Sequence, residues 1–203
     1  MSSVVPSSTL REVSGLDNRL PRLAEATLVL IDFQNTYRTG VMALPGAEDA
    51  LAAGARLLAA ARALDRPIVH IVNDGGEGTP YDIRAEIGSI SPEVAPRDGE
   101  PVVVKQVPDG FFGTALEQTL KDLGAGNDLV LCGFMTHMCV TFTAQGAFNR
   151  GYRPTVVAEA TATRPLPTPG GQPLSSAQLQ AAALTTIGDL FGVVAPTVDD
   201  LTA

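Results

Sequence analysis

The 203-residue sequence predicts an α/β fold, a three-layer α-β-α sandwich around a mostly parallel, six-stranded, Rossmann-like sheet. Two observations predict it. Short apolar runs rich in β-branched residues recur along the chain, which is typical of strands covered on both faces. Alanine- and leucine-rich stretches with helical spacing separate them, so strand and helix alternate. The expected strands are residues 28–31, 68–72, 102–104, 129–132, 155–158 and 192–195.

Four helices are expected between these strands, at residues 47–64, 114–123, 139–150 and 176–190. Thr114 and Glu117 have the spacing of a capping box, and Gly124 follows the same helix as its expected C′ residue.

Two segments lie outside this alternation. Residues 1–25 are predicted to form an N-terminal arm before one domain of residues 26–203. The stretch 164–173 is dense in proline and glycine and is predicted to be an irregular loop. A loop of that length is usually a lid or an interface element.

Composition excludes several classes of protein. Lys and Arg total 14 against 22 Asp and Glu, a net charge of −8, which disfavours binding to nucleic acid or to an anionic membrane surface. Two Cys and two His are too few for a disulfide scaffold or a closed zinc site. The N-terminus shows no secretory signal and no apolar run is long enough to span a membrane, so a cytoplasmic protein with reduced thiols is expected.

Three chemically active side chains follow three of the predicted strands. Asp32 and Lys105 come directly after apolar runs, and Cys139 begins the helix that follows the fourth strand. Each has a structural explanation alone: a helix cap, a lysine reaching solvent, and a small core residue. Carboxyl ends of parallel strands meet at one sheet edge, so together they predict a base, a cation and a nucleophile. The helix N-terminus should favour the thiolate of Cys139, whereas Cys132 lies inside a strand as a core residue.

The chain resembles the isochorismatase-like cysteine hydrolases, which include nicotinamidases and N-carbamoylsarcosine amidases. The segments that carry the resemblance are 30–35, 104–105 with 111–116, 132–140 and 156–163. The order Asp, Lys, Cys with a Gly-x-x-Thr-x-x-Cys-Val turn is its most specific part, and the resemblance covers residues 26–197.

The resemblance implies a catalytic triad of Asp32, Lys105 and Cys139. It also implies a cis peptide between Phe134 and Met135, so that the Met135 and Cys139 amides form an oxyanion hole. The reaction would be cleavage of the C–N bond of a small amide or ureide through a thioester, without a cofactor. Family members are usually homo-oligomers, so a dimer or tetramer is expected. The arm and the 164–173 loop are the candidate subunit contacts.

Two differences from well-known relatives reduce the range of activities that we expect. Nicotinamidases carry a histidine-containing metal segment after the second strand, but residues 73–78 contain no histidine here. His70 lies inside the strand and is interpreted as a packed core residue. We therefore expect no metal. True isochorismatases usually lack the nucleophilic cysteine, so Cys139 disfavours that activity as well.

Family position also suggests a substrate pocket, for which simple core packing is the alternative. Its candidate residues are Tyr37, Phe111, Phe112, Phe134 and Gln34. His137 is expected to point away from the nucleophile. Glu159 is interpreted as structural, with a hydrogen bond to the turn around the nucleophile.

Two alternative functions stay open at this point. The first is a catalytically idle member of the family that acts as a binding or assembly protein. The second is a thiol-reactive redox sensor at Cys139. The presence of Asp32, Lys105 and Cys139 together favours the hydrolase, because an idle site would be free to lose them.

Overall fold

A computed structural model describes residues 5–202, and its centre is a six-stranded sheet with the order β3-β2-β1-β4-β5-β8. Every neighbouring pair in this sheet is parallel. The strands are β1 (Thr27–Ile31), β2 (Ile68–Asn73), β3 (Val102–Lys105), β4 (Asp128–Phe134), β5 (Arg153–Ala162) and β8 (Val193–Ala195). All six predicted strands thus lie in one parallel sheet, and the predicted fold class is confirmed.

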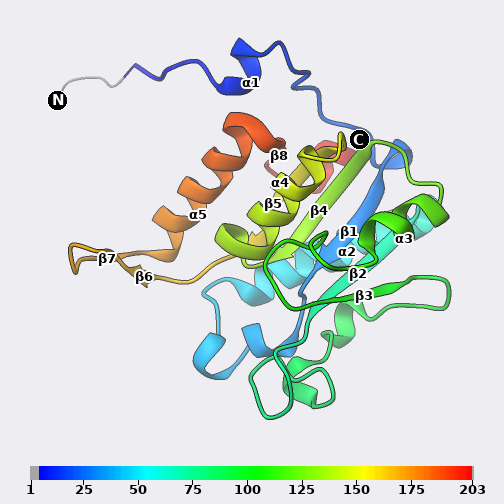
Figure 1. Ribbon diagram of the computed structural model, residues 1–203, viewed down its shortest axis with the longest axis vertical. Helices are drawn as coiled ribbons and strands as arrows, with labels where there is room; N and C mark the ends of the chain where they lie inside the picture. The colour runs from blue at the N-terminus through cyan, green and yellow to red at the C-terminus, as the bar shows by residue number, and fades with distance from the viewer. Residues whose placement is uncertain (1–4, 203) are drawn as a thin grey trace.

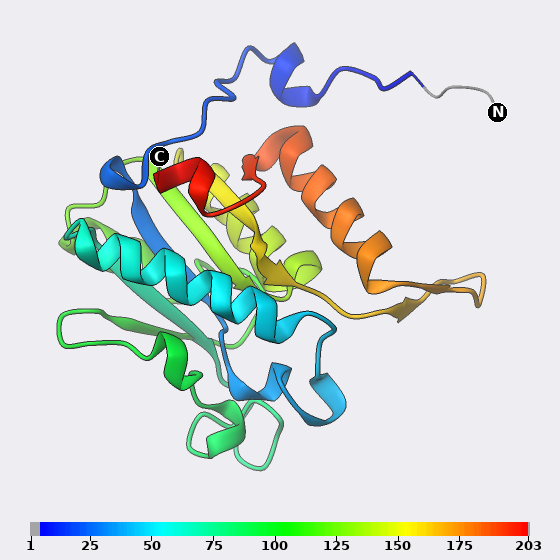
Figure 2. The ribbon, with the colours of Figure 1, turned by 180° about the vertical axis from the view of Figure 1, so that it is seen from behind.

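Helices cover both faces of the sheet. Figure 1 shows α3 (Leu116–Asp122), α4 (Thr141–Phe148) and α5 (Ser176–Thr186) on one face. Figure 2 shows α2 (Ala47–Ala63) on the other, with the short α6 (Asp199–Thr202). Each face packs its own hydrophobic core, and all residues of β1 are buried. This double covering explains why the strands are continuous apolar runs.

Helix ends differ in detail from the sequence prediction. The helix predicted at 139–150 begins as a π-helical turn, η6 (Thr136–Val140), and α5 ends in another, η7 (Ile187–Phe191). The capping box at Thr114 is wrong, because Ala115 is the N-cap and makes no side-chain cap bond. The Thr114 hydroxyl instead donates to the Gly110 carbonyl at 2.6 Å. Short 3₁₀ turns lie at Leu23–Glu25, Asn35–Tyr37, Gly40–Met42, Glu86–Gly88 and Pro92–Val94.

The Pro- and Gly-rich segment after β5 is more regular than predicted. β6 (Leu166–Pro167) and β7 (Pro173–Leu174) pair antiparallel as a small hairpin. Figure 1 shows this hairpin extending away from the main sheet. The irregular loop predicted at 164–173 is therefore wrong, because the segment pairs with itself. Its role as a lid or interface element stays a prediction.

The N-terminal segment packs against the body of its own chain. It forms a single helical turn, α1 (Leu10–Val13), beside η7. The Leu10 N–H donates to Asp189 Oδ1 at 2.9 Å, and the buried Arg11 guanidinium donates to the Leu190 carbonyl at 2.9 Å. Contact between this segment and a partner subunit stays a prediction. Residues 1–4 of the predicted arm lie outside the described residues.

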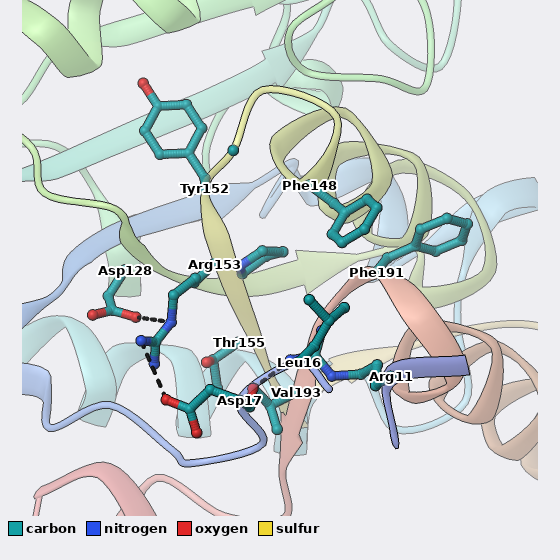
Figure 3. A pocket seen from close by; sticks show the side chains of 12 residues that line it. Arg11, Leu16, Asp17, Asp128, Phe148, Tyr152, Arg153, Thr155, Phe191 and Val193 are labelled. Carbon is teal, nitrogen blue, oxygen red and sulfur yellow. Dashed lines mark hydrogen bonds and ion pairs between the residues drawn. The ribbon is translucent and has the colours of Figure 1, made fainter. Parts of the chain in front are cut away.

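A cavity of about 240 Å³ lies under this segment at the amino ends of β4, β5 and β8 (Figure 3). Arg153 spans it, 3.2 Å from Asp128 and 3.3 Å from Asp17. Ligands of parallel α/β sheets bind beyond the opposite, carboxyl ends of the strands, so the search for a functional site begins there. None of the helices in residues 5–202 is long and apolar enough to cross a membrane.

Candidate active site

Asp32, Lys105 and Cys139 meet at the carboxyl edge of the sheet. Asp32 directly follows β1, Lys105 ends β3, and Cys139 lies in η6 after β4. Lys105 Nζ lies 2.7 Å from Asp32 Oδ2 and 3.2 Å from Cys139 Sγ. The crossing from β1 to β4 is the point where the strand order reverses, the usual ligand site of such sheets.

The three side chains are withdrawn from water. Asp32 is 0% exposed, Lys105 1% and Cys139 7%. Lys105 Nζ also donates to Asn73 Oδ1 at 3.3 Å. Asn73 lies opposite Lys105 in the register of β2 and β3. The sequence pattern did not predict this neighbour, because it depends on strand register. Within residues 5–202, Asp32 Oδ1 has no hydrogen-bond partner, so one carboxylate oxygen is free to accept a proton.

Burial controls the ionisation of this cluster. It raises the pKa of Asp32, although the nearby Lys105 charge opposes the rise. Burial also raises the pKa of the Cys139 thiol to about 12; the Asp32 carboxylate adds to this effect and Lys105 opposes it. For Lys105, burial lowers the pKa, but attraction to Asp32 and Cys139 prevails and the net shift is upward. The resting site is thus an ion pair beside a neutral thiol, and the predicted low-pKa thiolate is wrong.

Backbone geometry holds these groups in place. Asp32 has φ 50°, in the left-handed region that residues with a side chain rarely adopt. Gly133 has φ 123°, and a Cβ there would lie 1.9 Å from the Ile31 carbonyl oxygen. Only glycine therefore permits β1 and β4 to approach this closely just before Asp32. The Phe134–Met135 peptide is cis.

Two tyrosines lie next to this cluster. Tyr37, one of the predicted pocket residues, is 1% exposed and packs edge-on against Phe134 and Tyr81. Burial raises its pKa, and the charges of Asp32 and Cys139 raise it further. Tyr81 is half-buried and its pKa is also raised by burial and by Cys139. Tyr81 was missed because it lies in a long loop with no motif to mark it.

Gln34 is a positioning residue and not a pocket wall. Its amide nitrogen donates to the Asn73 carbonyl at 3.0 Å and to the Gly88 carbonyl at 2.6 Å. Its amide oxygen accepts from the Asn73 N–H at 3.0 Å. These bonds tie the end of β2 to the segment after β1 and leave the amide occupied. The pocket role predicted for Gln34 is therefore corrected.

The other predicted aromatic pocket residues differ in their surroundings, and their pocket role stays a prediction. Phe134 is 1% exposed and packs edge-on against Phe33, with ring centres 4.9 Å apart. Phe111 is buried, stacks on Tyr152 at 5.9 Å and lies under the Arg150 guanidinium. Phe112 points outward and is 68% exposed. Core packing, the alternative for aromatic residues, thus accounts for Phe134 and Phe111.

The remaining polar residues have clear partners. His137 Nδ1 hydrogen-bonds the Thr163 hydroxyl, and burial lowers its pKa. Glu159 Oε1 accepts from the Val198 N–H at 2.7 Å and pairs with Arg56 at 3.0 Å. The predicted bond from Glu159 to the nucleophile's turn is wrong, because the side chain faces the C-terminal segment.

The residue types of a metal site are also scattered. Buried His70 pairs with Glu100 at 3.0 Å. In residues 5–202, no group of three or more His, Cys, Asp or Glu side chains is arranged to hold a metal ion.

Fold and site together define a class: a Rossmann-like α/β protein with a buried Asp–Lys–Cys cluster at the switch point of its sheet. The family model of the isochorismatase domain matches residues 26–197. The chain belongs to the isochorismatase family.

Named relatives are similar in sequence over much of this chain. The secreted isochorismatase effector Isc1 of Verticillium dahliae is 32% identical over 95% of this chain and 98% of its own length. A streptothricin hydrolase of Streptomyces noursei is 33% identical over 82% of this chain and 67% of its own. The maleamate amidohydrolase of Pseudomonas putida is 31% identical over 68% and 72%. The chain is accordingly an enzyme of the hydrolase class that cleaves non-peptide C–N bonds, with amide or ureide hydrolysis as its general activity.

A solved structure extends the likeness to three dimensions. The crystal structure of an isochorismatase from Pseudomonas putida KT2440 superposes with a TM-score of 0.91 at 38% identity. The match covers 96% of this chain and 99% of that one. The sheet, both helical layers and the segments that hold the site are thus shared along almost the whole chain.

Proposed function

We propose that this chain is a metal-independent cysteine hydrolase that cleaves the C–N bond of a small amide or ureide through a thioester. One observation carries the proposal: Lys105 Nζ contacts both the Asp32 carboxylate and the Cys139 sulfur in a buried site. The base and the nucleophile are therefore held close together by a cation that contacts both of them. Residues 73–78 supply no histidine for a metal.

The first half of the reaction forms the thioester. Asp32 Oδ1 takes the thiol proton of Cys139 as the sulfur attacks the substrate carbonyl carbon. The raised pKa of Asp32 makes its carboxylate a stronger base for this step. Negative charge moves to the carbonyl oxygen, where the Met135 and Cys139 N–H groups stabilise it. When the tetrahedral intermediate collapses, the C–N bond breaks and the departing nitrogen takes the proton from Asp32.

The second half releases the acid. Water gives a proton to Asp32 and attacks the thioester carbonyl, and the same two amides hold the oxyanion. The C–S bond breaks and the proton returns to sulfur. Lys105 stays charged throughout and stabilises first the carboxylate and then the transient thiolate. Asn73 holds the Lys105 ammonium in place between them.

Activity measurements on the two cysteine variants test this proposal. Ammonia release from a panel of small primary amides and ureides identifies a substrate, and intact-mass spectrometry looks for an acyl adduct on the protein. Cys139→Ala should lower kcat by at least about 10³-fold and abolish the adduct. Cys132→Ala, at a buried cysteine inside β4, is the matched control and should keep both. Turnover by Cys139→Ala would refute the proposal.

The thiol pKa bears on the redox-sensor alternative. A sensor needs a resting thiolate, and burial raises the Cys139 pKa to about 12. The hydrolase also requires Cys139 to stay reduced, which favours a cytoplasmic location. A homo-oligomer, dimer or tetramer, with hairpin β6–β7 and an N-terminal arm of residues 1–25 as contacts, remains part of the proposal.

A further inference from the structure

The cavity at the amino ends of three strands lies at the opposite end of the sheet from the Asp–Lys–Cys cluster. It is lined by the first residues of β4, β5 and β8, which are Asp128, Arg153 and Val193. Its volume of about 240 Å³ exceeds the roughly 150 Å³ of an apolar protein cavity that takes up benzene. The space therefore admits one small ring together with one polar group.

The N-terminal segment forms one wall of this cavity through Arg11, Leu16 and Asp17. Arg11 is 7% exposed and fixes the wall in place. Its three guanidinium nitrogens donate to the Leu190 carbonyl at 2.9 Å, to Asn18 Oδ1 at 2.8 Å and to the Asp17 carbonyl at 2.5 Å. Because this wall is bonded to the body of the chain, the cavity is preformed, as small-molecule sites usually are.

Two polar atoms of the lining residues lack a hydrogen bond from the protein. Within residues 5–202, Arg153 Nη2 is buried and has no hydrogen-bond partner. Asp128 Oδ1 is buried and also makes no hydrogen bond there, although it lies 3.2 Å from Arg153 Nε. A buried donor and a buried acceptor are each costly when they stay unbonded. A complementary ligand therefore brings an acceptor for Nη2 and a donor for Oδ1.

The remaining features of the lining indicate the charge and the body of such a ligand. The four charged side chains of the lining balance one another, so a neutral ligand is favoured: Arg11, Arg153, Asp17 and Asp128. Phe148 and Phe191 pack edge-on, with ring centres 6.1 Å apart. Figure 3 shows these two rings on the side of the cavity away from the Arg153 guanidinium. A flat apolar ring can therefore pack on them while its polar group faces Arg153.

We propose that this cavity is a second small-molecule site, which binds a neutral aromatic molecule that carries a carboxamide. The amide oxygen accepts from Arg153 Nη2, and the amide N–H donates to Asp128 Oδ1. The ring packs against Phe148 and Phe191. The inference is independent of the proposed function, because Cys139 and its partners do not line the cavity.

A series of four probes that share one ring tests the chemical class in the full-length wild-type chain. Benzamide has the donor and the acceptor, acetophenone the acceptor alone, toluene neither, and benzoate a negative charge without the donor. Ligand-observed NMR titrations measure each affinity and also report any hydrolysis of benzamide. Benzamide should bind with a Kd of about 1 mM or tighter. Toluene and benzoate should bind at least about 10-fold more weakly, with acetophenone between them and benzamide.

Two variants locate the binding. Leu16→Trp fills the cavity without altering a charge and should weaken benzamide by at least about 10-fold. Leu10→Trp makes the same change at a residue of the same segment that is 49% exposed and outside the lining, and should leave the affinity unchanged. Arg153→Met removes the donor and should abolish the preference for benzamide over toluene.

Three results would overturn the proposal. Equal affinity of benzamide for wild type and for folded Leu16→Trp would place the binding elsewhere, for example in the active site. Equal affinities for benzamide and benzoate would contradict the chemical class. Absence of benzamide binding up to about 10 mM would exclude the site altogether. Circular dichroism checks the fold of each variant, and the wild-type probe series decides the class without any of them.

Discussion

Two buried charged clusters lie at opposite ends of the same strand pair, β2 and β3, and they use their acids in opposite ways. At the carboxyl end, Asp32 faces Lys105 and Cys139. At the amino end, Glu100 faces Arg62 and His70. The active-site cluster has one carboxylate oxygen without a partner in the described chain. Glu100 has partners on both of its oxygens.

The acids have opposite pKa shifts for this reason. Burial alone would raise the pKa of Glu100, but bonds from Arg62, the Arg97 N–H and His70 lower it to about 2. For Asp32, burial exceeds the effect of Lys105 and the pKa rises. Complete hydrogen bonding makes a carboxylate inert and stabilising, whereas incomplete bonding in a dry site makes it a base. The comparison therefore separates a structural ion cluster from a reactive one.

The largest expected effect comes from breaking the active-site pair. Lys105→Met should lower kcat by at least about 10³-fold. It should also lower the free energy of unfolding by about 3 kcal/mol, because Asp32 is left buried and unpaired. Chemical denaturation and steady-state kinetics measure both, with Lys121→Met, at an exposed lysine of α3, as the control. The double variant Asp32→Asn/Lys105→Met should regain stability without activity. A double variant as unstable as the single one would contradict this account.

Breaking the amino-end cluster should affect stability alone. Glu100→Gln removes the charge that holds Arg62 and His70, and should lower the free energy of unfolding by about 3 kcal/mol. The kcat of the folded enzyme should stay at the wild-type value, because the cluster lies at the other end of β2 and β3. A drop in kcat comparable with that of Lys105→Met would show that the two clusters are coupled.

The smallest expected effect is a change in how the free energy of unfolding depends on pH. Glu100 has a depressed pKa, so its contribution is present above about pH 4.5 and is lost as the pH falls to about 2. Asp32 has a raised pKa, so its contribution is present below pH 3.8 and is lost as the pH rises through the folded value. When the free energy of unfolding is measured at decreasing pH, it should therefore fall less steeply below pH 4.5 in Glu100→Gln than in wild type. Asp32→Asn/Lys105→Met should steepen it, and a change of the same sign in both would refute the comparison.

Most of the fold and the core of the candidate site could be predicted from local pattern. The apolar runs identified all six strands, because strands covered on both faces need apolar residues at consecutive positions. Asp32, Lys105 and Cys139 could be grouped because each follows a strand and parallel strands end at one edge. The capping box at Thr114 failed because the helix begins at Leu116 and Ala115 is its N-cap, so the Thr114 hydroxyl accepts from the Leu116 N–H at 3.2 Å and not from the N–H of Glu117.

Side-chain direction and ionisation could not be obtained in this way. Spacing does not say which way an aromatic residue faces, and only the structure shows that Phe111 and Phe134 pack in the core. The helix N-terminus predicted a thiolate, but burial beside Asp32 gives a neutral thiol. Asn73 and Tyr81 lie near the site through strand register and a long loop, neither of which leaves a motif.

The sequence by itself determined the parallel sheet, the three reactive residues that follow its strands, and the family. These depend on residue type and on periodicity along the chain. Only the tertiary structure decided which carboxylate is a base and which is a structural anchor. The physical reason is that pKa and hydrogen bonding depend on burial and on distances of a few ångströms between segments far apart in sequence.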